Sequence, residues 1–134
     1  MLFRSWDVNL ARPYIVKASE ELIELFRKDT IKGVTISAPG FYGPQGRVLR
    51  LGLAMPDMNE KFESFRFNDS DGSELKITNY EMEGSAIAAL AHHLGHKAIT
   101  VCCVIANRYL KEVNIDYHAR IDALIKLVLD KVTE

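Results

Sequence analysis

Hydrophobic and polar residues follow one another along the chain at spacings that predict alternating helices and strands. Residues 1–14 show neither the spacing of a helix nor the alternation of a strand and are expected to be irregular. Apolar residues recur at helical spacing over 19–28, where Ser19 can cap the helix and acidic side chains occupy its first turn. The short β-branched run 34–38 predicts a buried strand, which ends at Pro39 and Gly40.

The middle of the chain carries turn signals between short patterned segments. Residues 41–46 combine aromatic residues with glycine and proline and predict a loop. Residues 47–51 then alternate polar and apolar side chains, which predicts a strand. Residues 56–74 mix charged and aromatic residues and end in the polar turn 68–72, so we expect a partly covered excursion there.

The second half of the chain predicts a helix, a strand and a helix. After the run 75–78, residues 80–94 are rich in alanine and predict a helix that stops at Gly95. The nearly continuous apolar run 98–106 is typical of a central strand buried on both faces, and 116–132 has one apolar helical face. This order predicts a single α/β domain, residues 1–134, with a mixed, largely parallel sheet flanked by helices.

Composition and charge narrow the class of protein. Seventeen Lys and Arg against 18 Asp and Glu give a formal net charge of −1, so electrostatics favours neither nucleic acid nor an anionic membrane as a partner. The apolar runs are too short to span a bilayer, and the first residues lack the apolar region of a secretory signal. The neighbouring residues Cys102 and Cys103 do not suggest a disulfide framework and are expected to be buried structural thiols. We therefore expect a cytoplasmic protein.

Candidate chemistry follows the predicted strands, because ligands of open α/β sheets bind beyond the carboxyl ends of strands. Glu81 and Glu83 lie at such a junction. One interpretation is a capping box between Thr78 and Glu81, with Glu83 favouring the helix dipole. The other is that a glutamate there accepts two hydrogen bonds from a vicinal diol such as that of ribose, with Met82 packed on the sugar. The local sequence leaves both interpretations open.

Gln45 and Arg47 are two positions apart, so an extended backbone would place both side chains on one side. Uracil presents an acceptor, a donor and an acceptor on its edge, which suits a carboxamide beside a guanidinium. The positive charge of Arg47 would also stabilise uracil as it leaves with negative charge. A solvated loop with ordinary polar residues explains the same pair.

Metal binding is not expected. His92 and His96 have a metal-ligand spacing, but Gly95 should interrupt the helix between them, and a surface helix end explains the cluster. The turn 68–72 is similar to a calcium loop, yet Phe67 and Thr78 would occupy ligand positions. The sequence also lacks the glycine-rich and nucleophile motifs of common hydrolases, kinases and dinucleotide-binding proteins.

Three ordered motifs together resemble the nucleoside phosphorylase family, and within it the uridine phosphorylases. They are GVTISAPGFYGPQGR at 33–47, ITNYEMEGSA at 77–86 and VIANR at 104–108. The resemblance runs from about residue 13 to 132 but corresponds to only the C-terminal half of a family member. Gly43 and Pro44 reverse the order seen in well-known members, and Gly46 replaces a larger residue, while the spacing of Gln45 and Arg47 is kept.

The resemblance implies a substrate-binding site made of eight residues. Gln45 and Arg47 would hold the uracil edge, Phe41 would pack on the base or sugar, and Arg108 and Ile105 would lie near the base. Met82 and Glu83 would contact the ribose, whereas Glu81 belongs to the same motif and could equally be structural. Glu83 and Arg47 are the expected catalytic residues. Residues 105–107 contain no carboxylate, which favours a pyrimidine over a purine base.

The implied reaction is the phosphorolysis of uridine to uracil and ribose 1-phosphate, with phosphate as co-substrate and no cofactor. Family members bind phosphate with a half that precedes this part, and the surroundings of Arg4 and Arg12 do not match that motif. Weak or absent phosphorolysis is therefore expected. Half of an α/β sheet would also expose a strand edge and apolar faces, so we expect self-association into a homo-oligomer. The alternatives are a non-catalytic nucleoside-binding or interaction module, a nucleoside hydrolase, and a purine nucleoside phosphorylase or nucleosidase relative.

Overall fold

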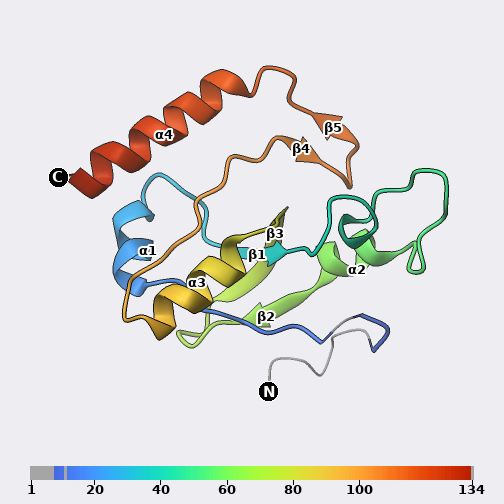
Figure 1. Ribbon diagram of the computed structural model, residues 1–134, viewed down its shortest axis with the longest axis horizontal. Helices are drawn as coiled ribbons and strands as arrows, with labels where there is room; N and C mark the ends of the chain where they lie inside the picture. Colours follow the sequence, from blue (N-terminus) through green and yellow to red (C-terminus); the bar gives the residue numbers. More distant parts are fainter. Residues whose placement is uncertain (1–7, 11, 134) are drawn as a thin grey trace.

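A mixed three-stranded sheet forms the centre of the molecule, seen in a computed structural model that describes residues 8–10 and 12–133 (Figure 1). The strand order is β1 (Val34–Ser37), β3 (Glu74–Glu81) and β2 (Arg66–Asn68). Strand β1 runs parallel to β3, with Ser37 opposite Glu81, whereas β2 runs antiparallel to β3. The carboxyl ends of β1 and β3 therefore meet at one edge of the sheet.

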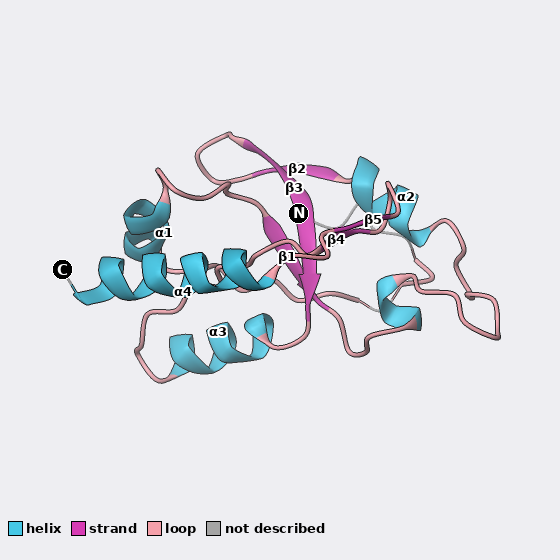
Figure 2. Ribbon diagram, turned by 90° about the horizontal axis from the view of Figure 1, so that it is seen from above, coloured by secondary structure: helices cyan, strands magenta, loops and turns pink. Residues whose placement is uncertain are grey.

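Helices flank this sheet. In Figure 2, α1 (Glu20–Phe26), α3 (Gly84–His93) and α4 (His118–Thr133) lie to one side of β1 and β3, and α2 (Met58–Ser64) lies to the other. The 3-10 turn η1 (Gly43–Gln45) and the short antiparallel pair β4 (Ala106–Asn107) and β5 (Glu112–Val113) complete the described elements. This arrangement confirms the predicted α/β fold with a mixed sheet flanked by helices. The buried apolar side chains among the described residues are those of Phe26, Ala38, Met58 and Phe62.

Several elements form where the sequence predicts them. Helix α1 lies within 19–28, although the Ser19 side chain makes no capping hydrogen bond. Strand β1 matches the run 34–38, and α4 matches 116–132 to within two residues at its start. Gly95 follows α3 with a φ of 77°, a left-handed conformation that ends a helix at low cost. The part of 1–14 that the structure describes contains no helix or strand; residues 1–7 and 11, with Arg4, lie outside the described residues.

Two predictions for the middle of the chain are wrong. Residues 47–51 form bends rather than a strand, and Val48, Leu49 and Leu51 are all more than half exposed. An alternating pattern forms a strand only against a hydrogen-bonding neighbour, and the described sheets offer none here. The segment 56–74, predicted as a partly covered excursion, contains α2 and β2 and so contributes to the fold.

The helix predicted from residue 80 begins later, at Gly84, because Tyr80 and Glu81 belong to strand β3. Strand β3 continues to Glu81, since Tyr80 and Glu81 pair with Ile36 and Ser37 of β1. The predicted capping box is therefore wrong. The hydroxyl of Thr78 instead has two acceptors within hydrogen-bond distance, Oδ1 of Asn79 at 3.0 Å and the carbonyl of Val34 at 3.3 Å.

The central strand predicted over 98–106 is also wrong. The chain runs extended there (Figure 1), but only its last residue, Ala106, joins a strand. The carbonyl of Ala98 accepts from the backbone N–H of Ser19, and that of Ile105 accepts from Asn114. Among the described residues β1 pairs only with β3, and Cys102 is exposed and Cys103 half-buried rather than both buried. Within the described residues, no helix is long and apolar enough to cross a membrane.

Candidate functional site

The candidate site lies at the edge where the parallel strands β1 and β3 end. The loop 41–47 follows β1, and Met82 and Glu83 follow β3 directly. Since Ser37 and Glu81 are register partners and the N–H of Ala38 donates to the carbonyl of Glu81, both connections leave the sheet at the same place. This is the position at which open α/β sheets bind ligands.

The loop 41–47 turns tightly around Gln45. The backbone N–H groups of Gln45 and Arg47 both donate to the carbonyl of Tyr42, at 3.0 Å each. Between them Gly46 has a φ of 69°, which lies in the left-handed region that glycine adopts without strain. The loop predicted over 41–46 is present, but its backbone is not extended at Gln45 and Gly46, so the spacing of two does not by itself place Gln45 and Arg47 on one side. The turn buries Gln45, which is 3% exposed, and half-buries Arg47.

Four of the predicted site residues come together around this turn. Nη2 of Arg108 donates to Oε1 of Gln45 at 2.6 Å. The guanidinium carbon of Arg47 lies 3.6 Å from the centre of the Phe41 ring, a cation–π distance. The guanidinium carbon of Arg108 lies 6.0 Å from the same ring centre. Residues far apart in the sequence thus form one cluster, which we call the arginine cluster: Phe41, Gln45, Arg47 and Arg108.

The arginine cluster holds two cations that no carboxylate of residues 8–10 and 12–133 pairs with. Burial lowers the pKa of Arg108 below its ordinary value, and the neighbouring charge of Arg47 lowers it further. Among the described residues neither arginine forms an ion pair, and the buried Nε of Arg47 has no hydrogen-bond partner. Two half-buried guanidinium groups with no negative partner favour a ligand that carries acceptors or negative charge.

Tyr80 and Asn59 support this cluster, although neither is singled out by the sequence motifs. The Tyr80 ring centre lies 5.9 Å from the guanidinium carbon of Arg108, and its hydroxyl donates to Oδ1 of Asn59 at 2.8 Å. Burial raises the pKa of Tyr80 to about 12, against the opposing charge of Arg108, so the phenol stays protonated at neutral pH. The alternation along β3 places Tyr80 on the face of the exposed Lys76 and Thr78, so the sequence pattern gives no signal for it. Tyr80 is half-buried because α2 covers this end of the strand, with the Phe62 ring centre 6.1 Å from its own.

Glu81 faces protein donors. Its Oε1 accepts from the hydroxyl of Ser37, and its Oε2 accepts from the backbone N–H groups of Glu83, at 2.8 Å, and Gly84. Burial raises the pKa of Glu81, but these hydrogen bonds outweigh it and leave the pKa below its ordinary value. The carboxylate thereby ties the start of α3 to the end of β1.

Met82, Glu83 and Ile105 are more open to solvent. Met82 is 43% exposed and Ile105 is 37% exposed. Glu83 occupies the N-cap position of α3 and is exposed, and its side chain makes no capping hydrogen bond. The carboxylate of Glu83 is therefore available to a ligand at the strand edge, unlike that of Glu81.

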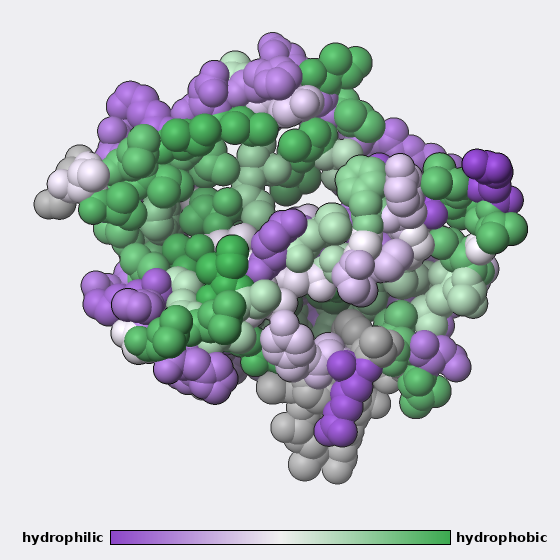
Figure 3. Space-filling model, in the orientation of Figure 1, coloured by the Kyte–Doolittle hydropathy of each residue, from purple (hydrophilic) through white to green (hydrophobic). Residues whose placement is uncertain are grey.

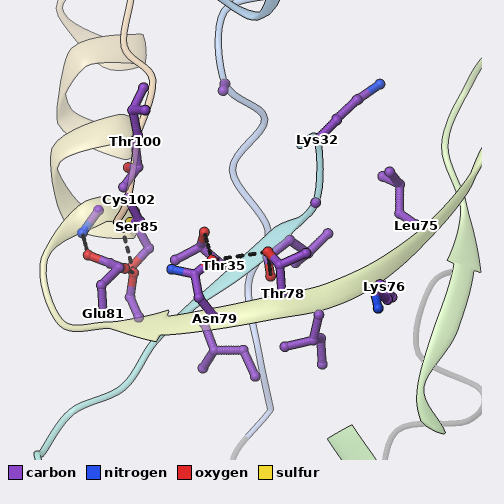
Figure 4. A pocket seen from close by; sticks show the side chains of 18 of the residues that line it. Lys32, Thr35, Leu75, Lys76, Thr78, Asn79, Glu81, Ser85, Thr100 and Cys102 are labelled. Atoms are coloured by element: carbon purple, nitrogen blue, oxygen red, sulfur yellow. Dashed lines mark hydrogen bonds between the residues drawn. The ribbon is translucent and has the colours of Figure 1, made fainter. Parts of the chain in front are cut away.

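A cavity of about 1460 Å³ lies beside this site rather than in it. It is bordered by β1, β3 and residues 99–104, and the face shown in Figure 3 is hollowed there between largely apolar surfaces. Figure 4 shows Glu81, Ser85, Thr100 and Cys102 along its wall, with Thr35 and Asn79 further along the sheet. Phe41, Gln45, Arg47 and Arg108 do not line it. The cavity marks the gap left because residues 99–104 do not pair with β1.

The histidines do not gather as ligands. His92 lies near the end of α3 and His96 lies beyond the left-handed Gly95, as the sequence predicts. Within the described part of the chain, no three His, Cys, Asp or Glu side chains are close enough to hold a metal ion together.

Comparison with known proteins identifies the family. The family model of the phosphorylase superfamily matches residues 3–131, and the chain belongs to this superfamily. It is 38% identical over 81 residues to a uridine phosphorylase of Thermococcus kodakarensis and 37% identical over 78 residues to uridine phosphorylase A of Schistosoma mansoni. These alignments cover 60% and 58% of this chain but 26% and 25% of the relatives, so the aligned part is about a quarter of their length.

A solved structure shares the fold. The Trypanosoma brucei nucleoside phosphorylase, whose structure is described as showing uridine phosphorylase activity, superposes with a TM-score of 0.76 at 28% identity. The match covers 88% of this chain and 42% of that chain. The α/β nucleoside phosphorylase fold predicted from the three motifs is thereby confirmed.

Proposed function

We propose that this chain carries the base-binding and ribose-binding part of a uridine phosphorylase site. The observation that carries the proposal is the arginine cluster, in which Arg108 and Gln45 meet at 2.6 Å and no carboxylate of the described residues neutralises either arginine. The uridine phosphorylases among its relatives support the same function.

The cluster suits the edge of uracil. Oε1 of Gln45 accepts from Arg108 and retains a second lone pair for the N3–H of the base, while the Gln45 amide group can donate to a base carbonyl. The half-buried guanidinium group of Arg47 can donate to the other carbonyl. When the glycosidic bond breaks, uracil takes the bonding electrons, and the charge that develops on its oxygens faces two guanidinium groups. Phe41, which is 46% exposed, offers a ring face for packing on the base or sugar.

Glu83 suits the ribose. Its exposed carboxylate at the end of β3 can accept hydrogen bonds from two vicinal hydroxyls, and Met82 beside it offers an apolar surface to the sugar. With the base and the ribose both held, the ribose carbon that carries the base is positioned for attack by phosphate as the base leaves as an anion. Ile105 contributes an apolar wall near Arg108, and Glu81 acts mainly by fixing the backbone that carries Glu83.

Phosphate is the proposed co-substrate, and no cofactor takes part in the proposed reaction. We place the phosphate-binding groups outside the part of the relatives that this chain aligns with, so phosphorolysis by the chain alone should be weak or absent. A role in pyrimidine salvage, a cytoplasmic location and a homo-oligomer belong to the same proposal. The partial coverage also favours a second candidate, a nucleoside-binding module without catalysis.

Uracil release from uridine, with and without phosphate, tests the function. The purified chain is compared with Glu83→Ala, and uridine binding is measured alongside. We expect uridine to bind, with little turnover in either buffer and weaker binding by Glu83→Ala. Fast release that requires phosphate would mean that the chain builds a complete phosphorylase site. Release that does not require phosphate would identify a nucleoside hydrolase, and absence of uridine binding would overturn the proposal.

A further inference from the structure

Helix α2 contacts the loop 41–47 through the side chain of Asn59. This residue is half-buried, between Met58 and the turn that contains Phe62, whose apolar side chains are both buried. Its carboxamide lies against Gly46 so closely that a Cβ at Gly46 would be 2.4 Å from Nδ2 of Asn59. The loop that carries Gln45 and Arg47 therefore rests directly on Asn59.

The same carboxamide holds the support of Arg108. The Tyr80 hydroxyl donates to Oδ1 of Asn59 at 2.8 Å, and the Tyr80 ring lies 5.9 Å from the Arg108 guanidinium carbon. Arg108 in turn donates to Gln45, the neighbour of Gly46. The contacts thus close a ring of five residues: Asn59, Tyr80, Arg108, Gln45 and Gly46.

We propose that Asn59 is a positioning residue for uracil binding, which sets the distance between the Gln45 turn and Arg108 by bridging Gly46 and Tyr80. The inference rests on the proposed function. Asn59 does not contact the base in this account. It acts because a binding group must be held to within a fraction of an ångström by a second layer of contacts.

This cycle of five contacting residues also explains why residue 59 is polar. An apolar side chain at 59 would leave the half-buried Tyr80 hydroxyl without its acceptor, and the aromatic side chain of Tyr80 could then turn away from Arg108. Without the carboxamide, the Gly46 turn would also lose its close contact with α2. Both effects would weaken the contact between Gln45 and Arg108, which the proposed function assigns to the uracil edge.

Uracil affinity measured by calorimetry tests the inference. Asn59→Ala and Tyr80→Phe should each weaken uracil binding by about tenfold, the worth of one lost hydrogen bond to a positioned group. Because Asn59→Ala already removes the hydrogen bond that Tyr80→Phe removes, the double variant should lose no more affinity than Asn59→Ala alone. Asn59→Asp keeps the acceptor and should retain most of the affinity. Glu60→Ala, at an exposed position of the same helix, is the control and should bind as the wild type does.

A ligand-independent measurement separates the two proposals. Gly46→Ala should lower the urea midpoint of unfolding, because the new methyl group clashes with Asn59. Asn59→Ala removes this clash, so the double variant should lose less stability than the two single variants added together. If the wild type binds no uracil, the proposed function fails and the positioning role with it. If the wild type binds uracil and Asn59→Ala binds it equally well, or if the effects of Asn59→Ala and Tyr80→Phe add, the inference alone is overturned.

Discussion

Arg108 donates a hydrogen bond to the buried carboxamide of Gln45 at 2.6 Å, although the two residues are 63 positions apart in the sequence. This contact joins the segment after the apolar run 98–105 to the loop after β1. It brings the charge of Arg108 to the turn that carries Arg47, and the neighbouring charge lowers the pKa of Arg108. The proposed base site depends on this contact.

Replacing Arg108 tests the contact on stability and on binding. Arg108→Met should lower the free energy of unfolding by about 1–3 kcal/mol, because the buried Gln45 oxygen loses its donor. Uracil affinity should fall by about tenfold. Urea unfolding and calorimetry measure the two effects, with the exposed Arg120→Met on α4 as the matched control. An unchanged uracil affinity would show that Arg108 does not serve the base.

Arg47 should separate stability from function. Arg47→Met removes the cation–π contact with Phe41, but it also removes a buried Nε without a partner and a charge that faces Arg108. These effects oppose one another, so the free energy of unfolding should stay nearly unchanged. Uracil affinity should nevertheless fall by at least about tenfold, because a charge-assisted hydrogen bond is lost. The exposed Arg50→Met, three residues along the loop, is the control. Equal affinities of these two variants would argue against a base contact by Arg47.

Glu83 should distinguish the sugar from the base. Glu83→Gln should weaken uridine binding by about tenfold, because the carboxylate no longer accepts from the ribose hydroxyls. Uracil binding should stay at the wild-type level, since uracil has no ribose. Parallel titrations with uridine and uracil measure both affinities. A variant that loses both equally would indicate a general disturbance of the strand edge.

The hydrogen bonds of Glu81 predict a dependence of stability on pH. Its folded-state pKa lies below the ordinary value of 4.5, so its contribution is fully present above that pH and is lost as the pH falls through the folded-state value. The difference in unfolding free energy between the wild type and Glu81→Gln should therefore be constant from about pH 5 to 7 and shrink below about pH 4.5. Urea unfolding at a series of pH values measures it, with the exposed Glu112→Gln as control. A difference that grows toward low pH would contradict this reading of the carboxylate.

The sequence predicts elements whose formation depends on local pattern. The β-branched run of β1 and the amphipathic face of α4 form where expected. The start of α3 and the run 98–105 depend instead on strand pairing. Tyr80 and Glu81 pair with β1 and so extend β3, whereas residues 98–105 form no strand. Pairing is a long-range property that periodicity does not report.

The candidate site divides in the same way. The motifs point to Phe41, Gln45 and Arg47 because these residues lie in one short loop. The contact between Arg108 and Gln45 comes from the fold, since no spacing in the sequence reports it. The support by Asn59 comes from α2, a helix that the mixed charged and aromatic pattern of 56–74 does not predict.

The most direct test of the account is a nuclear magnetic resonance titration of the isotopically labelled chain with uracil and uridine. The account predicts that uracil shifts the side-chain amide signals of Gln45 and the Nε–H signals of Arg47 and Arg108, and that uridine additionally shifts the backbone signals of Met82 and Glu83. Titration of the Arg47→Met variant should abolish the shifts at Gln45. Shifts confined to other parts of the chain, or none at millimolar ligand, would contradict the claim that this strand edge is a base and ribose site.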